Sequence, residues 1–307
     1  MAQRIEFFFL RCIKGIILLL PLKSVQRFGE FLGTVCYFLV WKRREIALDN
    51  LAQAFPDKTL AERKKITMGA FRSYAVSILE FLWFPNLTKE SLRKIVTIDH
   101  PEVFADCYNR GKGAIALSAH FGNWELNALA VALAGGYPTS IIVQTQSNTA
   151  VDAIINSHRT MFGSKVVPMG ISVREIIRAL QKSEVVALAA DQSGPMEGPY
   201  IDFFGRKTAG HQGPAVFALK MGSPMFLSLS RRNPDGTYLS HMEEIPTRDL
   251  VGGATEENIL TLTQRHTTIL ENYIRQFPDQ WLWLHRRWKH TLDNDGRLLT
   301  NGVRSDA

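Results

Sequence analysis

Cysteine, long apolar runs and low-complexity segments are scarce or absent in this chain of 307 residues. Its three cysteines, Cys12, Cys36 and Cys107, are too few and too widely spaced for a disulfide framework or a cysteine-based zinc site. Free thiols fit the cytosolic face of a membrane better than an oxidising compartment. No internal repeat is present either, so one main domain with an N-terminal appendage is the economical description.

No apolar run reaches the 18 or so residues that a membrane-spanning helix needs. Residues 5–22 are rich in Phe, Leu and Ile but carry three charges, and residues 28–41 carry one and lead into a Lys-Arg-Arg triplet. A signal peptide needs an uninterrupted apolar core and a cleavage site of small residues, and both are missing. Residues 1–41 therefore favour two amphipathic helices in the membrane interface. One marginal span and a helical hairpin packed on the domain are the alternatives.

Positive charge is in excess, with 36 Lys and Arg against 29 Asp and Glu and a pI near 9.4. This balance favours anionic partners such as phospholipid headgroups, phosphorylated sugars or an acidic protein, although solvated surface charge explains it equally well. Zinc-finger spacing, an RNA-binding signature and long basic runs are all missing, which argues against nucleic acid.

The pattern of apolar and polar residues changes near residue 97. Residues 1–95 are mainly helical in pattern, whereas short apolar runs alternate with helical patterns afterwards, which predicts an α/β fold with a mostly parallel central sheet flanked by helices. We expect a single domain over residues 42–292 and a polar tail over residues 293–307. The expected strands are Gly113–Ala119, Thr139–Val143, Lys165–Pro168, Val185–Ala190 and Met225–Ser230. The expected helices are Leu60–Trp83, Glu125–Ala134, Ala150–Phe162, Val173–Lys182, Pro214–Lys220 and Glu256–Gln276.

The segment Gly111–Ala134 carries the most informative pattern, because it predicts a strand, a sharp turn and a helix. Ligands of parallel sheets gather at the carboxyl ends of strands, where His120 lies. Glu125 follows early in the helix; on one continuous helix the two side chains would be about 140° apart. A bend is therefore required. Gly122 is the residue that permits it, and Asn123 is expected to cap the helix.

This arrangement predicts a catalytic His–carboxylate pair. Glu125 is expected to accept a hydrogen bond from one imidazole nitrogen of His120, while the other nitrogen takes a proton from an attacking hydroxyl. The spacing alone is weak evidence, because 8 His and 29 acidic residues give roughly 0.8 such pairs by chance. Two further pairs do occur later in the chain, but neither has the strand–turn–helix setting.

Three separated stretches together resemble the lipid A biosynthesis acyltransferases, the lauroyl/myristoyl transferase family within the glycerolphosphate-type acyltransferase group. The first combines Arg44-Glu45, Asn50-Leu51 and Ala54-Phe55-Pro56. The second, Ala119–Leu126, is similar to the family's catalytic box, and the third, Glu271–Lys289, to its C-terminal signature. The likeness thus runs from about residue 40 to residue 290.

The resemblance implies transfer of an acyl group from a thioester, usually on acyl carrier protein, to a hydroxyl of a glycolipid such as a lipid A precursor. It places the domain on the cytoplasmic side of the inner membrane. On the family pattern His120 is the base and Glu125 its partner, while Arg159 and Asp191 match further active-site residues. Without the family, Arg159 is equally well a surface arginine and Asp191 a turn residue.

Such a transfer needs a base, orientation of two substrates and donors for the tetrahedral oxyanion. It needs no metal and no organic cofactor. The backbone N–H groups of Gly122–Trp124 are candidate donors, and Arg159 is the alternative, as an oxyanion or phosphate ligand.

Three rival interpretations remain open from the sequence. A lipid hydrolase would use the same base on water, although the GxSxG elbow of such enzymes is missing. A non-catalytic binding protein would not be expected to keep His120, Glu125, Arg159 and Asp191 together. Another glycolipid, a phosphoinositol mannoside or an aminolipid is the closest alternative acceptor. The tryptophans at 281, 283 and 288 fit a membrane interface and a packed core equally well.

Overall fold

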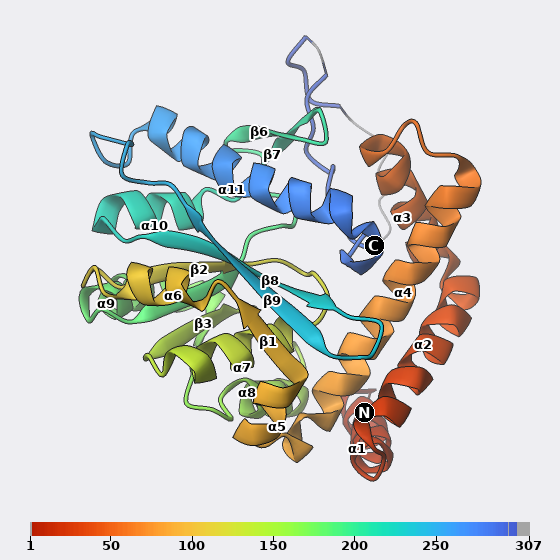
Figure 1. Ribbon diagram of the computed structural model, residues 1–307. Helices are drawn as coiled ribbons and strands as arrows, with labels where there is room; N and C mark the ends of the chain where they lie inside the picture. Colours follow the sequence, from red (N-terminus) through yellow and green to blue (C-terminus); the bar gives the residue numbers. More distant parts are fainter. Residues whose placement is uncertain (1, 294, 300–307) are drawn as a thin grey trace.

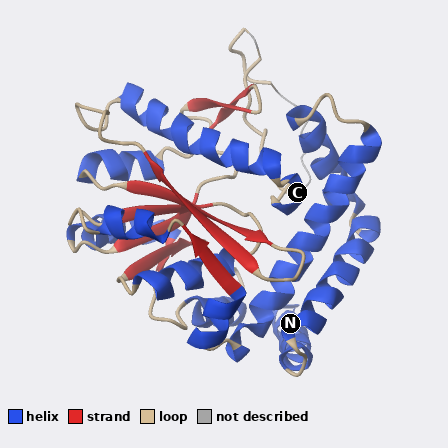
Figure 2. Cartoon of the chain, in the orientation of Figure 1, coloured by secondary structure: helices blue, strands red, loops and turns tan. Residues whose placement is uncertain are grey.

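The computed structural model describes residues 2–293 and 295–299 of the chain. Figure 1 shows a central twisted sheet with helices on its two faces and four N-terminal helices along one side. Figure 2 shows the same division by type of structure, with the strands gathered in the middle. The α/β class with flanking helices is therefore confirmed.

The sheet has seven strands in the order β1-β9-β8-β2-β5-β3-β4. All neighbours are parallel except β8 and β9, which form an antiparallel pair. The strands are β1 (Val96–Asp99), β2 (Ala114–Ser118), β3 (Thr139–Val143), β4 (Lys165–Pro168), β5 (Val185–Ala189), β8 (Met225–Arg232) and β9 (Tyr238–Ile245). The five expected strands are all present, so the mostly parallel sheet is confirmed; β1 and β9 were not predicted.

Two layers of helices cover the sheet. Helices α9 (Ser172–Gln181), α10 (Gly213–Met221) and α11 (Glu256–Gln276) share one apolar core with β2, β5 and β8. On the other face lie α6 (Pro101–Tyr108) and α7 (Trp124–Gly135). The remaining elements are α5 (Lys89–Ile95), α8 (Thr149–Arg159), the short helices η1 (Phe84–Asn86), η2 (Met169–Ile171) and η3 (Pro278–Gln280), and the hairpin β6 (Tyr200–Phe203) with β7 (Arg206–Ala209).

The N-terminal region is helical, as expected: α1 (Ala2–Leu18), α2 (Leu22–Leu39), α3 (Trp41–Ala54) and α4 (Leu60–Trp83). Helix α2 approaches α4 closely, because a Cβ at Gly29 or Gly33 would fall 2.7 Å and 2.5 Å from the Cα atoms of Val76 and Arg72. The opposite surface of α1 and α2 is apolar and exposed. No helix among the described residues is both long and apolar enough to cross a membrane.

The segment after α11 returns to the sheet and belongs to the core. Trp281, Trp283 and Trp288 are all buried and pack with Phe203 and Phe204 of the β6–β7 hairpin. Of the two interpretations of these tryptophans, the structure therefore shows the packed core. The predicted polar tail, residues 293–307, lies mostly outside the described residues.

Candidate active site

His120 stands on a sharp turn between β2 and α7, as the sequence predicts. Gly122 has a φ of +53°, and a Cβ there would lie only 1.8 Å from the carbonyl oxygen of Ser230. Only glycine fits this close approach. The side chain of Asn123 then accepts a hydrogen bond of 2.9 Å from the backbone of Leu126, so its predicted role as the helix cap is confirmed.

The turn is held from the far end of the chain. The backbone N–H of Leu282 donates to the carbonyl of His120 at 3.0 Å, and the N–H of Gly122 donates to the carbonyl of Gln280 at 2.9 Å. From α4, the hydroxyl of Ser77 donates to the carbonyl of Gly122 at 2.7 Å. The peptide groups around His120 are thus fixed by two elements that come from opposite ends of the sequence.

The carboxylate that contacts His120 is that of Asp191. Its Oδ1 lies 2.8 Å from the imidazole Nδ1, and its Oδ2 accepts hydrogen bonds of 2.9 Å from the His120 backbone N–H and the Trp281 indole. Asp191 follows β5, the sheet neighbour of β2, so both residues leave the same sheet edge. The Asp191 carboxylate is 2% exposed and the His120 imidazole 24%, so the pair has a buried side and an accessible side.

Electrostatics tune both members of this pair. Burial favours neutral imidazole, but the charge and hydrogen bond of Asp191 outweigh it, so the pKa of His120 is raised above its ordinary value. Burial alone would raise the pKa of Asp191, yet the charge and hydrogen bonds of His120 lower it to about 2. Asp191 is therefore ionised at neutral pH and stabilises an imidazolium at His120.

The predicted hydrogen bond between Glu125 and His120 is wrong. Glu125 instead forms a bidentate ion pair with Arg159, the last residue of α8. The distance from Arg159 Nε to Glu125 Oε2 is 2.9 Å. Glu125 acts on His120 through its charge, which helps to raise the histidine pKa. Sequence spacing suggested the nearer acid, whereas the partner in space lies 71 residues away.

The ion pair also bears on the two expected sets of oxyanion donors. Glu125 occupies the Nε–Nη2 edge of the Arg159 guanidinium, so an oxyanion or phosphate could meet Arg159 only through its remaining N–H groups. The N–H of Gly122 is used by Gln280, which corrects its expected role as a donor to substrate. The N–H groups of Asn123 and Trp124 remain, since neither has an acceptor within the described part of the chain.

A buried polar network that no sequence pattern predicted lies beneath the turn. Glu80 of α4 accepts hydrogen bonds from Asn123 at 2.6 Å, Gln26 of α2 at 2.7 Å and the hydroxyl of Tyr238 at 2.6 Å. Both polar atoms of the Asn123 side chain are therefore used internally, which makes Asn123 a positioning residue. Burial raises the pKa of Glu80 above its ordinary value.

An accessible imidazole nitrogen, a buried carboxylate behind it and free N–H groups at a helix start can take a proton from a hydroxyl and stabilise an oxyanion. The chemistry of this site is that of an acyl-transferring enzyme.

The chain belongs to the bacterial lipid A biosynthesis acyltransferase family, whose model matches residues 2–290. It is 24% identical over 280 residues to the lipid A biosynthesis lauroyltransferase of Escherichia coli K12, covering 88% of this chain and 87% of that protein. Identity to the palmitoleoyltransferase of the same organism is 26% over 280 residues, with 88% and 86% covered. A phosphatidylinositol mannoside acyltransferase of Mycolicibacterium smegmatis is 22% identical over 207 residues, which cover 66% and 64%.

Proposed function

We propose that this enzyme transfers a fatty acyl group from an acyl thioester, carried by acyl carrier protein, to a hydroxyl of a lipid A precursor. The single observation that carries the mechanism is the contact between His120 Nδ1 and Asp191, which leaves the other ring nitrogen, Nε2, for substrate. The family of the chain and its lipid A relatives support the choice of acceptor.

The chemistry follows from the orientation of the imidazole. With Nδ1–H donating to Asp191, Nε2 carries the lone pair and takes the proton of the acceptor hydroxyl as its oxygen attacks the thioester carbonyl. Asp191 stabilises the imidazolium, and the N–H groups of Asn123 and Trp124 stabilise the oxyanion. When the tetrahedral intermediate collapses, the C–S bond breaks and the imidazolium returns its proton to the leaving thiolate.

Glu125 and Arg159 have a positioning role in the site and take no part in the proton transfer. Their ion pair joins the first turn of α7 to the end of α8, and both side chains are mostly buried, at 16% and 17% exposed. We expect the pair to fix the position of α7, and with it the N–H groups that face the oxyanion. The sequence prediction that Glu125 is required for activity is retained with this different role.

The membrane surface is the proposed location, on the cytoplasmic side of the inner membrane. Helices α1 and α2 expose large apolar side chains beside a strong excess of basic residues in the first 44 positions, an arrangement suited to anionic lipid. The exposed apolar residues are Ile5, Phe8, Phe9, Ile13 and Ile16 on α1, Leu19 directly after it, and Phe28, Phe31, Phe38 and Leu39 on α2. The net charge of +7 also suits an acidic carrier protein as donor.

A second acceptor class has support from one relative. The matching mycobacterial protein acts, by its name, on phosphatidylinositol mannoside, so another glycolipid that presents a hydroxyl at the membrane is the alternative substrate. The His120–Asp191 pair serves both acceptors in the same way.

The test is transfer of labelled acyl groups from acyl carrier protein, in detergent, to a panel of purified lipid A precursors, phosphatidylinositol mannosides and aminolipids. We expect labelled lipid A product from the wild-type enzyme and a loss of about 10²–10⁴-fold in His120→Ala. The matched control is His290→Ala, a histidine outside the site. Labelled product from phosphatidylinositol mannosides alone would show that the second acceptor class, and not lipid A precursors, is the substrate. Release of free fatty acid without lipid product would overturn transfer in favour of hydrolysis.

A further inference from the structure

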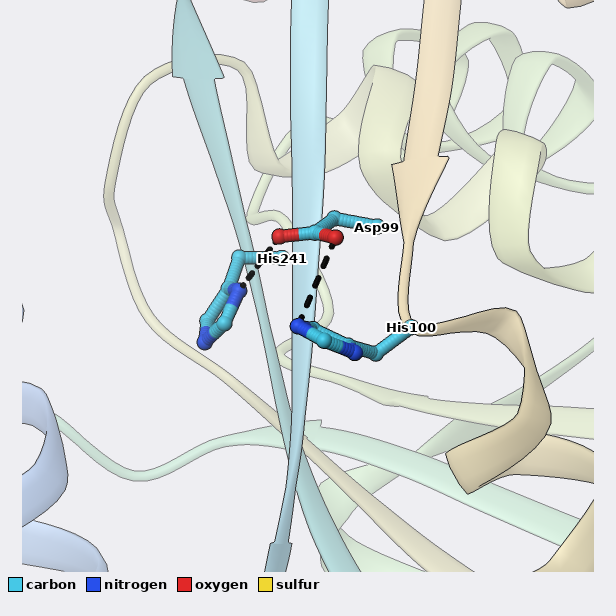
Figure 3. A group of neighbouring side chains, drawn as sticks. All are labelled: Asp99, His100 and His241. Carbon is cyan, nitrogen blue, oxygen red and sulfur yellow. Dashed lines mark hydrogen bonds and ion pairs between the residues drawn. The ribbon is translucent and has the colours of Figure 1, made fainter.

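A second cluster of chemically active side chains lies at one edge of the sheet, where β1 ends beside β9. Asp99 is the last residue of β1 and the register partner of His241 on β9, and His100 follows directly. Figure 3 shows the Asp99 carboxylate between the two imidazoles, with one oxygen toward each ring. In the described part of the chain this is the one group of three or more potential metal ligands within reach of one another.

The spacing of the ligand atoms suits a tetrahedral cation. His241 Nδ1 lies 3.1 Å from Asp99 Oδ2, and His100 Nε2 lies 3.5 Å from Asp99 Oδ1. Two ligands at about 2.0–2.1 Å from a tetrahedral zinc ion are about 3.3 Å apart, and each histidine nitrogen lies near that distance from a different oxygen of Asp99. One ligand atom from each of the three residues lies within 4.8 Å of the other two, so a modest side-chain movement brings all three to one cation.

The far nitrogen of His100 is hydrogen-bonded to a carboxylate, which is the usual environment of a metal-binding imidazole, and the far nitrogen of His241 has a carboxylate nearby. His100 Nδ1 lies 3.0 Å from Glu102, and His241 Nε2 lies 3.8 Å from Glu243. His241 Nδ1 donates a hydrogen bond to the Asp99 carboxylate, and a bound cation would take the place of that proton. Tyr273 of α11 stacks on the His241 ring with an interplanar angle of 12° and fixes its orientation.

We propose that Asp99, His100 and His241 bind a divalent transition-metal cation of the Zn²⁺ type, with solvent in the fourth position. Two imidazoles and one carboxylate suit such a cation better than Mg²⁺ or Ca²⁺, which prefer all-oxygen ligands. The cluster is accessible, with side chains 28–54% exposed, so a cation can enter from solvent.

The cation would join the edge strand β1 to β9 and so stabilise the fold, apart from the acyl transfer. In the sheet order, β9 and β8 separate β1 from β2, the strand that leads to His120. The transfer chemistry at His120 and Asp191 does not use this site. Strand β1 has only four residues and a neighbour on one side alone, so the link would help to hold it to the sheet.

The test uses full-length protein without a polyhistidine tag, freed of metal by a chelator and titrated with Zn²⁺ in a calorimeter. Titration with Co²⁺, followed by visible absorption, reports four-coordinate binding directly. We expect one cation per chain, and at least about tenfold weaker binding in Asp99→Asn and His241→Gln. His100→Asn is a third variant that keeps a residue tolerant of the left-handed conformation found there, with φ at 54°. Zn²⁺ is also expected to raise the melting temperature of the wild type, because binding to the folded state stabilises it.

The matched control is His290→Gln, which removes an imidazole that lies outside the cluster and is expected to leave Zn²⁺ affinity unchanged. Circular dichroism checks that each variant is folded. Absence of stoichiometric binding in the wild type, or equal Zn²⁺ affinity in all three cluster variants, would overturn the proposal.

Discussion

At the scale of residues, the turn that carries His120 depends on the missing side chain of Gly122. A turn between a buried strand and a helix needed a residue free to bend, and the structure gives it a φ of +53° against the carbonyl of Ser230. The helix cap at Asn123 was equally predictable, because capping depends on nearest neighbours along the chain.

The partner of His120 was not predictable in the same way. Spacing along the chain pointed to Glu125, but the contact that forms depends on which strands lie side by side. Asp191 follows β5, and β5 pairs with β2 in the sheet. Only the strand order, which local patterns do not contain, brings the two together.

The first prediction concerns Gly122→Ala. The added Cβ would fall 1.8 Å from the Ser230 carbonyl in a backbone conformation that alanine adopts poorly, so the turn must shift. We expect the free energy of unfolding, measured by urea denaturation, to fall by about 1–3 kcal/mol. We also expect a large loss of activity. The control is Gly136→Ala, which also has a positive φ but open space at its Cβ. Equal stability and activity of Gly122→Ala and the wild type would contradict the described turn.

At the scale of elements, strong periodic patterns were enough to place the buried strands and long helices. Leu60–Trp83 and Glu256–Gln276 match α4 and α11 at both ends. Strand β9 was missed because its sequence mixes apolar residues with His241, Glu243 and Glu244. Strand β1 was missed because its four residues follow directly on α5, with no turn residue between the two elements.

Helix α4 links the N-terminal helices to the site, a role that no local pattern suggests. Its Glu80 binds Gln26 of α2 and Asn123 of the site turn at once. Burial raises the pKa of Glu80, so the folded state binds its proton more tightly than the unfolded state. This contribution to stability is full below the ordinary pKa of 4.5 and is lost as pH rises through the raised value.

The second prediction is that Glu80→Gln lowers the free energy of unfolding by about 1–3 kcal/mol, because an amide group faces donors that need an acceptor. The difference in the free energy of unfolding between wild type and variant should be larger at pH 5 than at pH 8. Only the wild type has a carboxyl group at this position, so only the wild type loses the stabilisation by the bound proton as pH rises. Denaturant titrations at both pH values measure it. The companion variant Tyr238→Phe removes one donor and should cost less. A difference that is constant with pH would show that Glu80 does not titrate with folding.

At the scale of the whole molecule, the sequence predicted an apolar N-terminal region, and the structure shows one packed face and one exposed face. The helical hairpin packed on the domain and the interfacial pair of helices are thus compatible, because α2 packs on α4 while its outer surface stays free. Composition alone gave the apolar residues but not their division between the two faces.

The third prediction concerns membrane docking. Phe31→Glu with Phe38→Glu replaces two side chains, 63% and 61% exposed, on one face of α2. Each buried phenylalanine is worth about 1.5–3 kcal/mol, so binding to vesicles of anionic phospholipid should fall by roughly tenfold or more. Val251→Glu, which changes an apolar side chain that is 86% exposed away from these helices, is the control. Sedimentation with vesicles measures binding, and equal binding of both variants would contradict docking through α2.

The most direct test of the central claim is the pH dependence of kcat/KM for the wild type, Asp191→Asn and Glu125→Gln. A base with a raised pKa must lose its proton to work, so wild-type activity should rise with pH through a midpoint above 6.5. Asp191→Asn should move this midpoint to lower pH and reduce the maximum by about 10²–10⁴-fold. Glu125→Gln should reduce the rate with a smaller shift, because Glu125 acts on His120 through charge alone. A larger shift in Glu125→Gln than in Asp191→Asn would show that Glu125, not Asp191, is the partner of the base in the working enzyme.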